Sequence, residues 1–404
     1  MTDLSFSGLA AAAAVAFLAP LLLGLAPRLR VSPIVLEIVA GIAIGPAGLG
    51  LIAVDGPINV LSVIGLAFLL FLSGLDVDLA RLRGRTLGTI GLAFALSFAL
   101  SLLLGFGFGL LGVTRSPLLV AIILSATALG VVTPVLEDAG EASSRVGQLV
   151  IAAASTAELV PIVLLSLFFS RASGGAGMQA ALLGLFAALA LAVTVGIAGA
   201  ERLLPLQELL ARLQDTTAQI RVRGAFLLLA LFAALAERFG LEVILGTFLA
   251  GALLRLLDRD AMETHPLLRP KLDAIGYGVF VPVFFVSSGL RFDLRALAAS
   301  PENLARIPLF LLALLVIRGL PAILYRPLIG GRRAVAAGLL QATSLSFIVA
   351  ATRIGLEFHL LGAATAAALV AAGLLSVLLY PPAALALLRR DGAPGALKGR
   401  FFMR

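Results

Sequence analysis

The chain of 404 residues is 61% hydrophobic and 13% charged, with 42 glycines and 19 prolines. Soluble domains contain ~45–50% apolar and ~25% charged residues, so this composition excludes a soluble enzyme. The net charge of +8 resembles that of nucleic-acid-binding proteins, but the basic residues lie in loops between apolar runs, and we expect no nucleic-acid partner. The chain has no cysteine and two histidines, His265 and His359, which argues against a thiolate or histidine metal site. We expect no cofactor.

Thirteen apolar runs, separated by charged or Gly/Pro-rich breaks, divide the chain. A helix needs about 20 apolar residues to cross a bilayer, so we predict an all-α polytopic membrane protein with thirteen transmembrane helices. The first run is read as a retained span, because residues 1–7 contain no basic residue and the apolar stretch is too long for a signal peptide. The predicted spans are residues 5–26, 33–52, 58–75, 86–113, 117–136, 146–170, 178–200, 221–238, 240–257, 272–289, 304–325, 333–352 and 360–388.

The basic residues indicate how the chain crosses the membrane. With the N-terminus outside, the inner loops and the basic tail 389–404 hold 22 of the 30 Lys and Arg residues, and the outer loops hold 7. The positive-inside rule therefore predicts an external N-terminus and a cytoplasmic C-terminus. The one remaining basic residue, Arg318, lies in the middle of the eleventh span.

An internal match indicates a repeat. Residues 73–82 read Ser-Gly-Leu-x-x-Asp-Leu-x-x-Leu, and residues 288–297 repeat this pattern after an offset of 215 residues. The offset corresponds to seven spans, an odd number, so the second copy enters the membrane from the opposite side. This predicts an inverted-topology repeat, a design typical of secondary transporters with ion sites near the bilayer midplane. Two weaker echoes pair Ala40-Gly41 with Ala250-Gly251 and Ala126-Thr127 with Ala342-Thr343.

Polar residues interrupt two repeat-related spans, the fifth and the twelfth. In the fifth span we expect Pro134 to remove a helical hydrogen bond and free backbone carbonyls for a ligand. The alternative is a purely structural role, in which the hydroxyls bond back to their own helix and the proline only kinks it. Because both interruptions fall at a similar depth, we predict two crossed, broken helices. The polar residues are Ser125, Thr127 and Thr133 in the fifth span, and Gln341, Thr343, Ser344 and Ser346 in the twelfth.

Three charged side chains lie inside predicted spans at more than three positions from either end, namely Glu37, Glu158 and Arg318. A charge at the bilayer centre costs several kcal/mol, so each is a functional candidate. Glu158 follows Ser155 and Thr156, and Ser155 shares its helical face. A carboxylate beside hydroxyls and freed carbonyls suits a hard cation, and a proton would compete for the same oxygens. We therefore predict that Glu158 couples proton and cation binding.

The roles of the other two charges are left open by the residues. Arg318 can form a structural ion pair with Glu158, occupy the ion site when it is empty, or bind an anion. Glu37 lies nearer a cytoplasmic helix start, where the helix dipole favours a carboxylate, and a structural or gating role fits it better than ion binding.

Three segments resemble bacterial monovalent cation:proton antiporters of the Kef and NapA type. Residues 33–46, PIVLEIVAGIAIGP, are similar to the second-span signature of that family, and residues 71–78, FLSGLDVD, to the segment after its third span. Residues 240–251 resemble its ninth span. The resemblance implies a homodimer in the bacterial inner membrane that works by elevator-like alternating access. It places Glu158 at the ion-coupling position, Arg318 at a basic position of the eleventh span and Thr127 at the fifth-span crossing.

The same resemblance implies a division of the chain into two kinds of domain. Dimer-domain helices would occupy 1–85 and 221–303, and core-domain helices would occupy 86–170 and 304–388. Span seven with a cytoplasmic loop would fill 171–220, before the tail 389–404. The family usually has aspartate at the coupling position after Asp, Asn or Gln, whereas this chain has Ala157-Glu158. With one carboxylate at the site, the simpler expectation is that one proton is exchanged for each monovalent cation, which makes the exchange electroneutral.

These observations favour a homodimeric, non-enzymatic antiporter that exchanges H⁺ for Na⁺ or K⁺ within membrane lipid. The residues do not distinguish Na⁺ from K⁺. Two alternatives use the same fold: an anion or organic-acid transporter that binds its substrate at Arg318, and an ion channel or efflux pore.

Overall fold

The computed structural model describes residues 6–25, 32–76, 85–169, 176–201, 213, 216–257 and 267–389, and these residues contain helices and no strand. Within them, nine helices are long and apolar enough to cross a membrane. The first half contains α1 (Ser7–Leu25), α2 (Pro33–Ile44), α3 (Gly56–Asp76), α4 (Arg85–Leu110), α5 (Pro117–Ser125), α6 (Leu129–Asp138), α7 (Arg145–Phe169) and α8 (Ala176–Glu201). The second half contains α10 (Ile220–Arg238), α11 (Val243–Leu257), α13 (Leu268–Ile275), α14 (Val281–Leu290), α15 (Leu294–Ala298), α16 (Pro301–Leu314), α17 (Arg326–Ile329), α18 (Gly331–Gln341), α19 (Ser346–Glu357) and α20 (Ala363–Arg389).

Each predicted span has a helical counterpart, but the count of thirteen membrane-crossing helices remains a prediction. The apolar helix α2 ends at Ile44, before the expected end of the second span, and α11 begins at Val243. Helix α10 carries Arg221, Arg223, Glu237 and Arg238 within 19 residues, more charge than an ordinary membrane helix holds.

Two long helices contain irregular turns. A π-helical turn, Gly276–Phe280, joins α13 to α14, and a second one, Leu315–Gly319, follows α16. The latter continues through a 3₁₀ segment into α17. Such turns widen a helix locally and change the direction of the side chains that they carry. One of these side chains is Arg318.

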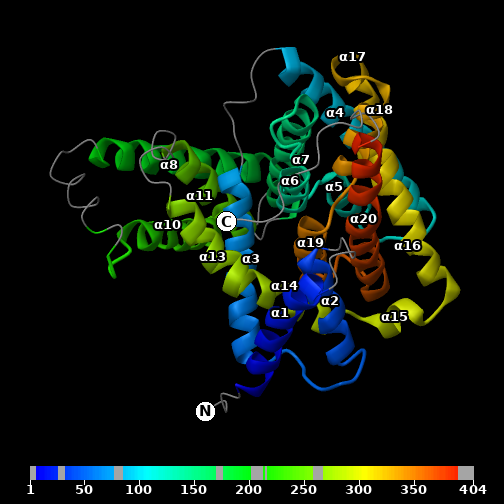
Figure 1. Cartoon of the computed structure of the whole chain (residues 1–404), viewed down its shortest axis with the longest axis horizontal. Coiled ribbons are helices and arrows are strands. Elements are labelled where there is room, and N and C mark those ends of the chain that lie inside the picture. The colour runs from blue at the N-terminus through cyan, green and yellow to red at the C-terminus, as the bar shows by residue number, and fades with distance from the viewer. Residues whose placement is uncertain are drawn as a thin grey trace.

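The helices form two groups in space. Helices α4 to α7 and α16 to α20 gather on the right of Figure 1. The second group extends to the left with α8, α10, α11 and α13, and below with α1, α2 and α14. Helix α3 runs between the two groups and packs closely against α11 and α14.

Two of the tightest helix crossings depend on glycine. A methyl group added to Gly74 of α3 would lie 2.0 Å from the carbonyl oxygen of Phe248 in α11, and one added to Gly289 of α14 would lie 2.2 Å from that of Ile38 in α2. Only a residue without a side chain permits backbones to approach this closely. These contacts hold α3 on α11 and α14 on α2.

Candidate functional site

The fifth predicted span is interrupted, as expected. Helix α5 ends at Ser125 and α6 begins at Leu129, with extended backbone at Ala126 and Ala128. The prediction that Pro134 causes the break was wrong in position, because Pro134 lies inside α6. The reason is tertiary: the N–H groups of Thr127 and Ala128 donate to carbonyls outside their own helix, so those contacts replace the helical bonds.

The twelfth predicted span is also interrupted, between α18 and α19, and the two breaks touch. The N–H of Ala128 donates to the carbonyl of Thr343 at 2.9 Å, and the Thr127 hydroxyl donates to the carbonyl of Gln341 at 2.6 Å. The N–H of Thr127 also lies 3.3 Å from the carbonyl of Ala157 in α7. The prediction of two broken helices that cross is therefore confirmed by these backbone contacts.

Four helix ends meet at this crossing. The carboxyl ends of α5 and α18 carry partial negative charge, whereas the amino ends of α6 and α19 carry partial positive charge. A cation is favoured near the first pair and an anion near the second. The crossing therefore accommodates one buried group of each sign at low cost.

Arg318 is the cation at the crossing. Its side chain is 2% exposed, and it donates from Nε to Thr127 Oγ1 at 2.9 Å, from one terminal nitrogen to Ser97 Oγ at 3.0 Å and from the other to Gln341 Oε1 at 3.2 Å. The guanidinium also lies over the ring of Phe94, 5.7 Å from its centroid. All three hydrogen-bond acceptors are neutral. Arg318 thus ties both broken helices together and keeps its charge.

Glu158 is the buried carboxylate, on α7, and it is 1% exposed. Its Oε2 atom has no hydrogen-bond partner among the described residues, and no ion pair there joins it to Arg318. Polar groups close enough to act on it include the hydroxyl of Ser73 on α3 and the backbone N–H of Leu129, the first residue of α6. An incompletely bonded carboxylate beside a helix amino end can accept either a proton or a cation.

The predicted supporting residues fall into two sets. Hydroxyls that donate back to their own helix stabilise the helix and leave only oxygen lone pairs for a ligand. They belong to Ser125, Ser155, Thr156 and Thr343. Buried polar atoms without a partner in the described part of the chain belong to Thr133, Ser344 and the amide nitrogen of Gln341. Ser346, the other polar residue predicted in the twelfth span, begins α19 and is buried.

Glu37 lies outside this crossing. It is buried on α2, a helix that packs against α1 and α14 rather than against α5, α6 or α7. The structure therefore does not bring Glu37 together with Glu158. A gating or structural role for Glu37 stays a prediction.

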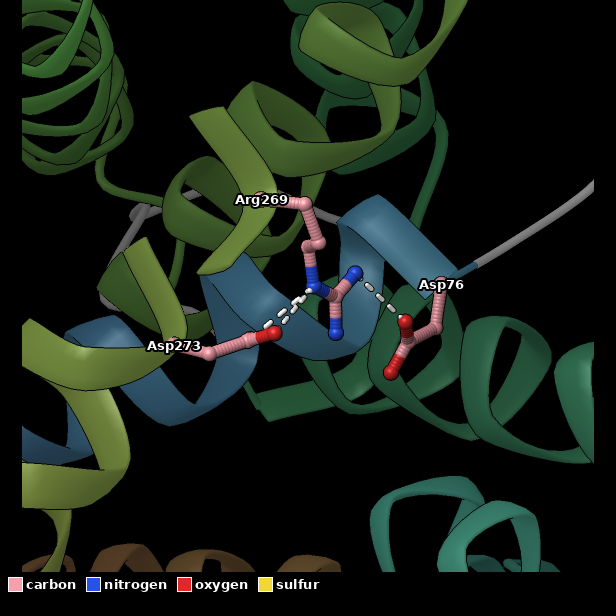
Figure 2. Close-up of polar contacts among 3 residues, drawn as sticks. All are labelled: Asp76, Arg269 and Asp273. Atoms are coloured by element: carbon pink, nitrogen blue, oxygen red, sulfur yellow. Dashed lines mark hydrogen bonds and ion pairs between the residues drawn. The ribbon is translucent and has the colours of Figure 1, made fainter. Parts of the chain in front are cut away.

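A charged cluster beside Glu158 was missed by the sequence reasoning. Figure 2 shows the Arg269 guanidinium of α13 between two carboxylates, Asp76 at the end of α3 and Asp273 one turn along α13. The Arg269–Asp76 contact is 2.6 Å, and the Arg269–Asp273 contacts are 2.9 Å. Asp76 lies within electrostatic range of Glu158. The segment FLSGLDVD does contain Asp76, but we read Asp76 and Arg269 as loop charges, and only the packing of α3 on the helix that begins with α13 joins them.

This chain is similar to known proteins along most of its length. The sequence model of a family described as "Sodium/hydrogen exchanger, transmembrane" matches residues 13–389. The chain is 33% identical over 410 residues to YjbQ of Bacillus subtilis strain 168, whose assigned name is that of a Na⁺/H⁺ antiporter, and the match covers 98% of this chain and 65% of that protein. It is 26% identical over 374 residues to the Na⁺/H⁺-K⁺ antiporter GerN of Bacillus cereus, covering 89% of this chain and 90% of GerN.

A solved structure shares the fold. The sodium proton antiporter MjNhaP1 of Methanocaldococcus jannaschii, determined at pH 8, superposes with a TM-score of 0.67 over 95% of this chain and 98% of that chain. The two sequences are 20% identical, so the similarity shows a common fold.

Proposed function

Because the chain belongs to the transmembrane sodium/hydrogen exchanger family, we propose that it exchanges protons for Na⁺ or K⁺ by alternating access, with Glu158 as the shared binding group. The observation that carries the proposal is a buried carboxylate with an unpartnered oxygen beside two crossed, broken helices. Such a group binds one cation or one proton, but not both at once. Exchange follows if only the occupied forms cross between the two sides.

Charge balance supports an electroneutral cycle. Glu158 is neutral when protonated and is neutralised by a monovalent cation when it is ionised, so the moving site carries the same net charge in both directions. Arg318 donates its hydrogen bonds to Thr127, Ser97 and Gln341 and keeps a constant positive charge beside the carboxyl ends of α5 and α18. In this proposal Arg318 holds the crossing together and does not exchange ions.

The glycine crossings support an inverted repeat. The offset of the internal match pairs Gly74 with Gly289, and its weaker echo pairs Gly41 with Gly251. In space Gly74 packs against the Gly251 region of α11, while Gly289 packs against Gly41 of α2. A two-fold operation that exchanges the repeats turns one contact into the other. The division into dimer and core domains, the homodimer and the location in the bacterial inner membrane are further parts of the proposal.

The test is the variant Glu158→Gln in proteoliposomes, with Na⁺ and K⁺ gradients and a pH-sensitive dye inside. The variant keeps the size of the side chain but cannot ionise, so we expect it to lose cation-dependent proton movement. The matched control is Glu302→Gln, which changes an exposed glutamate in the first turn of α16 and should retain exchange. Undiminished exchange in Glu158→Gln would refute the mechanism.

A second candidate follows from the hydrogen bonds of Arg318: within the described part of the chain its partners include no carboxylate, so its charge is available to an anion. Anion uptake by the wild type that is lost in Arg318→Gln, without cation-dependent proton movement, would favour that function. Dissipation of a cation gradient without proton movement, and unaffected by Glu158→Gln, would instead indicate a channel.

A further inference from the structure

The charged cluster of Asp76, Arg269 and Asp273 is more accessible than the carboxylate that it adjoins. The side chains of Arg269 and Asp76 are 29% and 20% exposed, whereas Glu158 is 1% exposed. A partly exposed ion pair contributes only modestly to stability. A role in folding is therefore a weak explanation for placing it at the end of α3.

The position of Asp76 relative to the crossing points to a role in ion binding instead. The π-helical turn that follows α13 connects the end of α3 to the crossing: a methyl group added to Gly276 would lie 2.5 Å from Leu72, one turn before Asp76, and one added to Gly130 of α6 would lie 3.4 Å from the Tyr277 hydroxyl. The Asp76 carboxylate is within electrostatic range of Glu158, of Arg269 and Asp273 of α13 and of Arg255 of α11. Arg269 contacts Asp76 directly.

We propose that Arg269 determines the cation affinity of the transport site by cancelling the charge of Asp76, so that the negative charge that attracts the ion at the crossing is that of Glu158. This inference rests on the proposed exchange function. Arg269 is a positioning residue here, because it acts on the ion through Asp76 and does not bind it. Arg269 also contacts Asp273 one turn along its own helix, and its contact with Asp76 does not depend on that pairing.

The proposal predicts the direction in which cation affinity changes when Arg269 is removed. Without Arg269, the ionised Asp76 would add a second negative charge near Glu158, and that charge attracts a cation. In partly hydrated protein, one nearby unit charge that does not touch the ion changes ion affinity by about tenfold. The affinity conferred by Glu158 alone is weaker, which permits faster release after each crossing.

The experiment measures the cation KM and the maximal exchange rate in proteoliposomes, at a pH high enough that KM no longer changes with pH. Arg269→Gln should lower KM about tenfold. Arg269→Lys, which keeps the charge, should stay near the wild-type value. Asp76→Asn added to Arg269→Gln should restore the wild-type KM, because it removes the uncovered charge. Asp273→Asn is the matched carboxylate control and should change KM by less than about twofold, since Asp76 remains paired with Arg269.

The outcomes separate the two proposals. If the wild type does not exchange cations for protons, the proposed function fails. If the wild type exchanges and Arg269→Gln leaves KM unchanged, or if the double variant does not restore it, the inference about Arg269 is overturned. Equal losses of maximal rate and thermal stability in Arg269→Gln and Asp76→Asn, with constant KM, would identify a purely structural ion pair and also overturn it.

Discussion

At the scale of single residues, Thr127 makes hydrogen bonds to several separate elements at the crossing. Its N–H bonds to α7, its hydroxyl donates to Gln341, and the same oxygen accepts from Arg318. A serine or threonine in a helix normally satisfies its hydroxyl within its own helix. Thr127 instead connects three separate elements, because it lies where the helix has stopped.

Replacing Thr127 by valine tests this role. The variant keeps the shape but leaves the carbonyl of Gln341 and the Nε of Arg318 without partners, which should lower the free energy of unfolding by about 2–4 kcal/mol. The control is Thr352→Val, which removes an equally buried hydroxyl that bonds only within α19 and should change stability by less than about 1 kcal/mol. Thermal unfolding in detergent measures both. Equal melting temperatures for the two variants would contradict the bridging role.

At the scale of helices, packing depends on small residues. Gly74 and Gly251 face each other where α3 crosses α11, and a methyl group on Gly251 would lie 1.9 Å from the carbonyl oxygen of Phe71. Carbonyl oxygens cannot move without breaking helical hydrogen bonds. The crossing therefore has little capacity to adapt to a larger residue, and it fixes the end of α3 that carries Asp76.

The variant Gly74→Ala should force α3 and α11 apart and destabilise the protein by about 1–3 kcal/mol or more. The matched control is Gly224→Ala in α10, where an added methyl group meets no atom within 4 Å. Alanine favours a helix over glycine by up to about 1 kcal/mol, so the control should be neutral or slightly stabilising. Folded yield in size-exclusion chromatography distinguishes them. If both variants behave alike, close backbone packing is not the reason for glycine at position 74.

At the scale of the whole molecule, the orientation of the chain in the membrane determines which side of the transport site faces the cytoplasm. The balance of 22 basic residues against 7 predicts that the exposed segment at Thr217 faces the cytoplasm and that the start of α16 at Glu302 faces outward. On this orientation, the cluster of Asp76, Arg269 and Asp273 lies on the cytoplasmic side of Glu158.

The chain has no cysteine, so single-cysteine variants can be labelled without background reaction. A membrane-impermeant maleimide applied to intact cells should label Glu302→Cys and should label Thr217→Cys only after the membrane is opened. Both positions are exposed, so access to the reagent depends on sidedness alone. The reverse labelling pattern would invert the orientation, and labelling of both variants in intact cells would refute the predicted topology.

Much of the site was predictable because burying a charge in a membrane is costly. That cost singled out Glu158 and Arg318, and polar residues in apolar spans indicated both broken helices from the sequence alone. The break near Ser125 was misplaced because proline is a local signal, whereas the actual interruption depends on acceptors in α18 and α7. Asp76 and Arg269 were missed for a related reason: a charge at the end of a span looks like a loop charge until its neighbours are known.

The sequence by itself determined the class of the protein, since hydropathy and charge distribution act on each helix separately and require no partner. It also predicted an inverted repeat and a coupling carboxylate, Glu158, and both stay predictions. Only the tertiary structure decided what each buried charge contacts: Arg318 binds neutral oxygens rather than Glu158, and Arg269 lies against Asp76. The contacts of Arg318 with Thr127 and of Arg269 with Asp76 join residues about 190 positions apart, and they depend on how helices cross, which no local pattern specifies.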